Sequence, residues 1–155
     1  KHNFMHVIIF LDIDGVMVPA KGWKIPELLD DGFPAFSKSA TKILRQFISE
    51  DVTVLLTTSH KSRFTDDEWR TIFKNRGIDV TTIHSLPANH KNVSRKEEIL
   101  NWFKQNRLDA KYVIIDDDTS LQDLPTSIKS KLVQTSPHVG LTDEHIEVIN
   151  SILEK

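Results

Sequence analysis

The sequence predicts an α/β protein with a Rossmann-like, three-layer fold, in which helices cover both faces of a central, mostly parallel sheet. Three observations predict it: apolar runs of strand length, amphipathic segments of helix length between them, and polar residues directly after three of the runs. Continuous apolar runs are typical of strands buried on both faces, which is common in parallel sheets. Strands that alternate with helices favour right-handed crossovers between parallel neighbours.

The strands are expected in five segments that are rich in Val, Ile and Leu. In chain order these are residues 7–11, 52–56, 78–83, 112–115 and 132–135. The first, second and fourth runs are almost wholly apolar, which indicates strands that are buried on both faces. The third and fifth runs contain more polar residues, so their strand pattern is less pronounced.

Helices are expected where apolar residues recur on one face of an amphipathic segment. The predicted helices are residues 37–49, 65–75, 94–105 and 142–153. Thr65 with Glu68, and Ser94 with Glu97, have the form of capping boxes that begin the second and third helices. Gly77 follows the second helix at a position typical of a glycine C-cap.

The length indicates a single domain over residues 1–155, because a βα unit takes about 30 residues and five units take about 150. That leaves no room for a mobile cap domain, and the longest irregular stretch, residues 17–36, is long enough only for a short flap.

The 20 basic and 22 acidic side chains nearly balance, which excludes a strongly charged disordered chain. The absence of cysteine excludes disulfides, thiolate nucleophiles and cysteine-ligated metals.

No apolar run approaches the roughly 18 residues that a membrane-spanning helix needs, since the longest covers only residues 7–11. The start of the chain also lacks the apolar stretch of a signal peptide. These observations predict a cytoplasmic protein that does not contact membranes.

Acidic and hydroxyl residues follow the three strongest strands, at the edge where open α/β sheets bind ligands. Carboxylates that converge there repel one another unless a cation compensates. A cluster of oxygen donors without cysteine favours Mg²⁺ over zinc. The expected metal ligands are Asp12, Asp14, Asp116 and Asp117.

Three motifs resemble those of the haloacid dehalogenase (HAD) superfamily of phosphatases and phosphotransferases. Residues 10–16 (FLDIDGV) resemble its first motif, residues 55–59 (LLTTS) its second, and residues 113–117 (VIIDD) its fourth, in the same order over most of the chain. Within the superfamily the chain resembles the small, capless HAD domains related to bacterial RNA-repair proteins. The Gly-Leu-Thr at residues 140–142, before the last helix, is similar to theirs.

The resemblance implies a Mg²⁺-dependent phosphomonoester hydrolase that acts through an aspartyl-phosphate. Asp12 would be the nucleophile, already ionised at neutral pH as carboxyls usually are. Asp14 would be the general acid and base, with a pKa raised by the crowded acidic site, and its backbone carbonyl would bind the metal. Asp12 and Asp117 would be carboxylate ligands; Asp117 is preferred to Asp116 because it aligns with the usual Asp of the fourth motif.

The resemblance also implies residues that contact the phosphate. Thr58 would hydrogen-bond the transferring phosphoryl group, and the motif leaves Thr57 and Ser59 open as alternatives. Gly15 would lie beside the substrate in the first motif. The third motif requires a cation at the start of the helix before the fourth motif, and an arginine supplies a permanent charge with a fork of donors. Its candidates, in order of preference, are Arg95, Lys96 and Lys91.

An uncapped site is open to bulky phosphates, such as nucleotides, nucleic-acid ends or phosphoproteins, and a second subunit is a possible cover. Since the net charge of −2 attracts no polyanion, a nucleic-acid substrate requires a local basic rim. The candidate cations of this rim are Lys21, Lys24, Lys61, Arg63, Lys91, Arg95 and Lys96.

Several alternatives remain open from the sequence. The main one is a non-catalytic phosphate- and metal-binding module, regulatory or scaffolding, on the same fold; Asp at both catalytic positions weighs against it. A phospho-receiver is disfavoured because its acidic pair would follow the first strand. For His60 and Trp23, loop packing is favoured over a contact with substrate, and Asp118 either assists the metal or caps the next turn.

Overall fold

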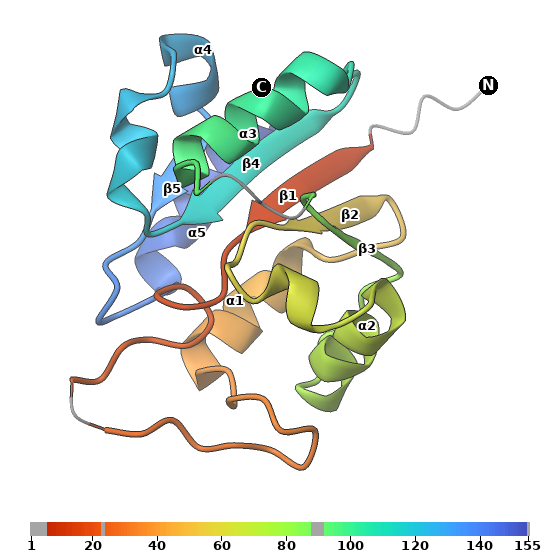
Figure 1. Cartoon of the computed structure of the whole chain (residues 1–155), viewed down its shortest axis with the longest axis vertical. Helices are drawn as coiled ribbons and strands as arrows, with labels where there is room; N and C mark the ends of the chain where they lie inside the picture. Colours follow the sequence, from red (N-terminus) through yellow and green to blue (C-terminus); the bar gives the residue numbers. More distant parts are fainter. Residues whose placement is uncertain (1–5, 23, 88–91, 155) are drawn as a thin grey trace.

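The computed structural model describes residues 6–22, 24–87 and 92–154, and its centre is a five-stranded sheet in the order β3-β2-β1-β4-β5 (Figure 1). Neighbouring strands pair in parallel, so their carboxyl ends share one edge. The strands are β1 (Val7–Leu11), β2 (Val52–Leu56), β3 (Thr82–Ser85), β4 (Lys111–Asp116) and β5 (Leu132–Gln134). Because β2 and β4 flank β1, the chain reverses its direction across the sheet at β1, which is where ligands bind in such folds.

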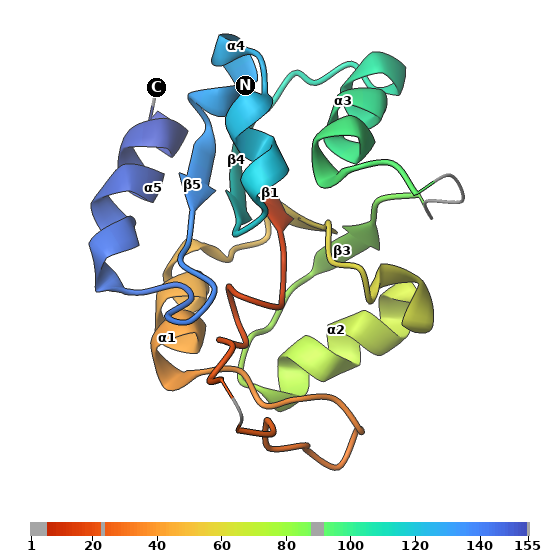
Figure 2. The same ribbon diagram turned by 60° about the vertical axis from the view of Figure 1, so that its left-hand side comes forward.

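Helices cover both faces of the sheet, which confirms the predicted α/β class (Figure 2). The α-helices are α1 (Lys38–Phe47), α2 (Asp66–Asn75), α3 (Arg95–Gln105), α4 (Thr126–Lys129) and α5 (Ile146–Glu154), and the short 3₁₀ helices are η1 (Lys61–Arg63), η2 (Thr119–Asp123) and η3 (Asp143–His145). The capping boxes predicted at Thr65 and Ser94 are both present. In the described part of the chain, no helix has the length and apolar character needed to cross a membrane.

The side chains of β1 show how the sheet divides the core. Ile9 and Leu11 pack with residues of α1, α2 and α5, whereas Phe10 faces the opposite side with α3, α4 and η2. On that side, the Phe10 ring lies 5.2 Å from the ring of Trp102 and 5.6 Å from that of Phe103, measured between centroids. Both faces of β1 are therefore buried, which explains its continuous apolar run.

The third strand lies later than predicted. It covers Thr82–Ser85 rather than residues 78–83, because Ile78 and Val80 are buried in the core from a loop outside the sheet. Burial of alternate residues produces a strand-like pattern without strand pairing. The short elements η2 and α4 were also not predicted, and the last predicted helix begins as the 3₁₀ turn η3.

The segment from Met17 to Phe36 joins β1 to α1 without a helix in its described residues, as expected for a short flap. Its regular structure there is limited to isolated bridges, one of them pairing Leu28 with Pro34. Phe33 anchors the segment because its fully buried ring packs edge-on against Phe64 and Trp69.

An ion pair fixes the same segment to the end of α2. Arg76 Nη1 donates to Asp31 Oδ2 at 2.6 Å, and Nη2 donates to Asp31 Oδ1 at 3.0 Å. The guanidinium also donates to the carbonyl oxygens of Phe33, Pro34 and Ile72, so it is well satisfied although only 3% of its side chain is exposed. The hydrogen bonds from Arg76 hold the pKa of the Asp31 carboxyl well below its usual range.

We expect Asp31→Asn to lower the free energy of unfolding at neutral pH by about 3 kcal/mol, because it leaves Arg76 buried without its counter-charge. Since folding lowers the pKa of Asp31, this stabilisation is complete above its unfolded value of 3.8 and is lost as the pH falls through the folded value. The difference between the variant and the wild type should therefore shrink in acid. Urea denaturation at neutral pH and well below pH 3.8 measures it, with the neighbouring exposed Asp30→Asn as the control. An equal difference at both pH values would contradict the ion pair as its cause.

Candidate active site

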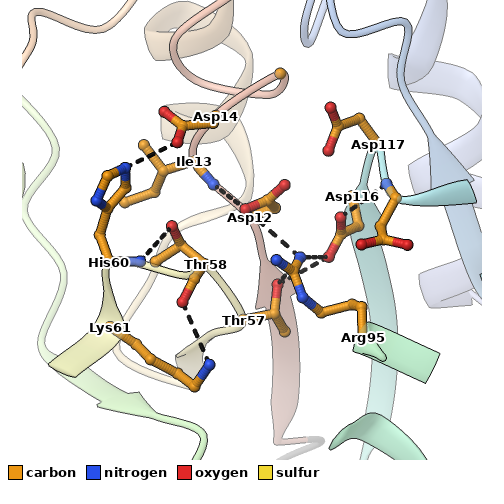
Figure 3. A network of polar contacts seen from close by, with 12 residues as sticks. Asp12, Ile13, Asp14, Thr57, Thr58, His60, Lys61, Arg95, Asp116 and Asp117 are labelled. Atoms are coloured by element: carbon orange, nitrogen blue, oxygen red, sulfur yellow. Dashed lines mark hydrogen bonds and ion pairs between the residues drawn. The ribbon is translucent and has the colours of Figure 1, made fainter. Parts of the chain in front are cut away.

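Polar residues from three neighbouring strands meet at the carboxyl end of β1 (Figure 3). Leu11 pairs with Leu56 of β2 and with Ile115 of β4, so the residues that follow, Asp12, Thr57 and Asp116, lie side by side. Backbone hydrogen bonds extend this alignment past β1: Asp12 N donates to Ile115 O at 3.0 Å, and Thr57 N donates to Leu11 O at 2.9 Å. The convergence expected from the sequence is therefore a direct result of the strand register.

Asp116 is fully buried, and both of its carboxylate oxygens accept hydrogen bonds. Its Oδ2 accepts from Arg95 Nη1 at 2.6 Å and from the Thr57 hydroxyl at 2.9 Å, while Oδ1 accepts from Asp118 N at 3.0 Å. Arg95 is the first residue of α3, and its Nη1 also lies 3.6 Å from Asp12 Oδ1. The guanidinium is therefore shared between two carboxyl groups.

The Asp12 carboxyl lies in the most crowded part of the cluster. Only 4% of the residue is exposed, and its Oδ1 accepts from Ile13 N at 2.8 Å. Burial and the nearby charge of Asp116 raise the pKa of Asp12 to about 9, although Arg95 opposes the shift. The expectation that Asp12 is ionised at neutral pH is therefore wrong for the protein without a cation. The carboxyl that lies among other charged groups is that of Asp12. The Asp14 side chain is 59% exposed and points away from the cluster (Figure 3).

Three of the carboxylates are placed to hold a cation together. Asp12, Asp116 and Asp117 each offer an oxygen within 4.8 Å of the others, and Asp14 is not part of this group. The donors are all oxygen, which suits a hard divalent cation. A cation here would also replace the proton that burial otherwise imposes on Asp12. The donor set and its electrostatics therefore fit a metal ion.

Gly15 makes room for Asp117. A Cβ atom built on Gly15 would lie 2.0 Å from Asp117 Oδ2, and Gly15 has a φ of +82°. Its carbonyl oxygen accepts a hydrogen bond from the Thr135 hydroxyl at 2.7 Å, which fixes the turn from the β5 side. A side chain at this position would displace a potential metal ligand.

The three hydroxyls after β2 have different surroundings. Thr57 faces Asp116, as described above, and Ser59 is exposed. The hydroxyl oxygen of the buried Thr58 accepts from His60 N at 3.2 Å and lies on the Asp14 side of the cluster in Figure 3. This geometry keeps Thr58 as the candidate for phosphate contact, since the Thr57 hydroxyl is already hydrogen-bonded to a carboxylate.

His60 contacts the candidate acid–base residue directly. Its Nε2 lies 2.8 Å from Asp14 Oδ2. Loop packing was the favoured interpretation from the sequence, and its only signal there was its position next to the hydroxyl run. The pair joins residues 46 positions apart, so local patterns do not predict it.

The expected basic rim is only partly present. Lys61 is buried, and its Nζ donates to Glu98 Oε2 at 2.9 Å. Glu98 Oε1 also lies 3.5 Å from Arg95 Nε, so both cations point inward and neither belongs to a surface rim. Lys21, Lys24 and Arg63 are exposed.

The remaining candidates are placed as follows. The Lys96 amide N–H donates to the Ser120 hydroxyl, and Lys96 lines a surface cavity between α3 and η2 rather than the carboxylate cluster. Asp118 Oδ1 accepts from Ser120 N at 2.9 Å, so Asp118 caps η2. Lys91 and Trp23 lie outside the described residues.

The sequence matches the family model of the "HAD domain in Swiss Army Knife RNA repair proteins" over residues 8–146. The match therefore extends from β1 to the start of α5 and includes every residue of the cluster. No curated protein matches the chain significantly.

Gly15→Ala should destabilise the protein more than Gly32→Ala. Both glycines have positive φ, which costs an alanine about 1 kcal/mol, but a Cβ on Gly32 would meet no atom within 4 Å. The overlap with Asp117 should add about 2 kcal/mol at Gly15. Urea unfolding of the two variants measures the difference. Equal losses would mean that Asp117 moves aside freely and is not held in place by this turn.

Proposed function

Since the chain belongs to the family of HAD domains in Swiss Army Knife RNA repair proteins, which supports a phosphatase-type activity, we propose that it is a Mg²⁺-dependent phosphomonoester hydrolase acting through an aspartyl-phosphate. The observation that carries the proposal is the buried Asp12 carboxyl at the end of β1, between Arg95 and the acidic pair Asp116 and Asp117. It combines a nucleophile, a fixed positive charge and a metal-binding group at one strand end.

In the first step the Asp12 carboxylate attacks the phosphorus. An oxygen–phosphorus bond forms to Asp12 while the bond to the leaving oxygen breaks, and Asp14 gives that oxygen its proton. In the second step water attacks the same phosphorus, Asp14 takes a proton from the water, and the bond to Asp12 breaks. A carboxylic acid that alternates between acid and base in this way has to reach the solvent side of the phosphate, which suits the exposed position of Asp14.

Arg95 supplies the charge that balances the phosphoryl oxygens. Burial alone would lower its pKa, but Asp116 and Asp12 raise it above its ordinary value, so the guanidinium stays charged throughout. It is better placed for this role than Lys96, because Arg95 is within 3.6 Å of Asp12 whereas Lys96 lines a cavity on another side of α3.

Asp12, Asp116 and Asp117 would hold the Mg²⁺ ion, and the backbone carbonyl of Asp14 is a further donor by family resemblance. When bound, the ion would neutralise the carboxylates and the negative phosphoryl oxygens. Mg²⁺ usually keeps several waters and binds substrate phosphate, and it requires few protein ligands.

We propose a phosphorylated nucleic-acid end or nucleotide as the substrate, because the matched family is described by its occurrence in RNA repair proteins. The described residues between β1 and α1 contain no helix that would form a cap, which supports a bulky phosphate monoester as the substrate. Thr58, Ser59 and Gly15 would border the phosphate, and the exposed Arg63, which lies beside His60, is a candidate for a contact to the nucleic-acid strand beyond it.

Asp12→Asn should abolish phosphate release from nitrophenyl phosphate and from a phosphorylated oligoribonucleotide, because an amide does not form the acyl phosphate. We expect a loss of at least about 10³-fold with an unchanged fold, measured by phosphate release and circular dichroism. Asp109→Asn removes an exposed carboxyl before β4 and is the matched control. Retained turnover in Asp12→Asn would contradict the mechanism.

In the same assay, faster hydrolysis of the phosphorylated oligonucleotide than of the mononucleotide would support an open site. The reverse preference would indicate that a second subunit or the segment of residues 17–36 covers the site.

Mg²⁺ should bind with the release of about one proton below pH 9, since the ion takes the place of the Asp12 proton. The dissociation constant should therefore fall about tenfold per pH unit up to about pH 9. Calorimetry in two buffers of different ionisation enthalpy measures the proton release.

The same ion should raise the melting temperature, because it binds the folded state and relieves carboxylate repulsion. Asp117→Asn should remove most of this rise, whereas Asp109→Asn should keep it. A melting temperature that does not respond to millimolar Mg²⁺, or binding without proton release, would count against the metal site.

A further inference from the structure

Asp14 has a single support at its exposed position. Within the described part of the chain, its carboxylate hydrogen-bonds to His60 alone, at 2.8 Å between Asp14 Oδ2 and His60 Nε2. An exposed aspartate without a partner samples several rotamers, whereas a proton donor has to be held at one place to act on a substrate. His60 is therefore the group that decides where this carboxylate lies (Figure 3).

His60 is itself held from three directions. Its backbone N–H donates to the Thr58 hydroxyl oxygen at 3.2 Å, and its ring stands edge-on against the buried Phe33 ring, with centroids 5.6 Å apart. On the third side, Arg63 Nη1 lies 3.4 Å from His60 Nδ1, and the Arg63 guanidinium stacks 5.2 Å above the Phe64 ring. These contacts fix both the position and the rotation of the imidazole.

The Arg63 contact also determines the tautomer. A guanidinium has donors only, so the His60 Nδ1 that faces it has to present a lone pair. The ring proton is then on Nε2, which points at Asp14 Oδ2. His60 thus donates from Nε2 to the Asp14 carboxylate.

We propose that His60 is a positioning residue for Asp14: its Nε2–H holds Oδ2 and leaves Oδ1 for the substrate. The inference rests on the proposed role of Asp14 as acid and base. Because Oδ2 accepts from His60, the transferable proton is on Oδ1. The Oδ1–H bond breaks as the leaving oxygen gains that proton, and Oδ1 takes a proton back as water attacks the phosphorus. The carboxylate formed between these steps keeps the hydrogen bond from His60.

The test compares His60→Ala with His60→Gln, whose Nε2–H reaches a similar distance from the backbone as that of histidine. An alkyl phosphate needs a proton on its leaving oxygen, whereas nitrophenyl phosphate hardly does. His60→Ala should lower kcat on the alkyl phosphate about 10- to 100-fold, with a much smaller effect on nitrophenyl phosphate and on KM. His60→Gln should restore most of the loss. In an Asp14→Asn background, His60→Ala should cause no further loss.

His84→Ala is the matched control, because His84 Nδ1 makes a hydrogen bond of 2.9 Å to Asp66, the first residue of α2, and not to Asp14. It should leave the dependence on the leaving group unchanged. Equal losses on both substrates after His60→Ala, or additive losses with Asp14→Asn, would overturn the proposal. If instead the wild type and Asp12→Asn behave alike on every substrate, the proposed hydrolase function fails.

A second measurement does not depend on turnover. ¹⁵N chemical shifts of the imidazole at slightly alkaline pH report the tautomer, and we expect the proton on Nε2, with a shift that changes in Asp14→Asn. A proton on Nδ1, or no response to Asp14→Asn, would overturn the positioning role whether or not the protein hydrolyses phosphates.

Discussion

Buried negative charge at the carboxyl end of β1 is the constraint on which the site depends. Asp116 has no exposed surface and Asp12 almost none, and an uncompensated carboxylate at such a position costs several kcal/mol. The positive charge of Arg95 compensates both carboxylates. Arg95 also pairs with Glu98, which accepts a hydrogen bond from Lys61. Acids and bases therefore alternate from the sheet through the start of α3 to η1. This chain of ion pairs explains how the Lys61 and Arg95 side chains can be buried at the carboxyl edge of the sheet.

A single guanidinium does not balance the whole cluster, and the remaining charge has two possible partners. One is a proton on Asp12, whose pKa burial and Asp116 raise to about 9; the other is a divalent cation held with Asp117. The two exclude each other at the same carboxylate. A bound cation would therefore keep Asp12, the proposed nucleophile, ionised, so the metal-binding group and Asp12 are parts of one electrostatic arrangement. Gly15 has no side chain to collide with Asp117, so the Asp117 carboxylate can lie directly beside the turn after β1.

The sequence predicted the features that depend on local pattern. The runs at β1 and β2 were predicted to the residue, and parallel pairing then brings Asp12, Thr57 and Asp116 together without further information. Features that depend on distant contacts were missed. In the sequence, Lys61 cannot be told from a surface lysine, because its partner Glu98 lies 37 positions later. The third strand was predicted too early because Ile78 and Val80 are buried in the core without pairing in the sheet. The pairing of His60 with Asp14 is of the same kind.

Asp14, the proposed acid–base residue, is exposed, and the described part of the segment from Met17 to Phe36 supports its position indirectly. The bidentate pair between Asp31 and Arg76 fixes the segment to α2, and Phe33, two residues after Asp31, is thereby held in the core. The ring of Phe33 forms the surface against which His60 stands, and His60 contacts the exposed Asp14. The segment therefore supports His60 through the buried Phe33 ring. The position of the exposed Asp14 carboxylate thus depends on buried contacts that reach it through His60 and Phe33.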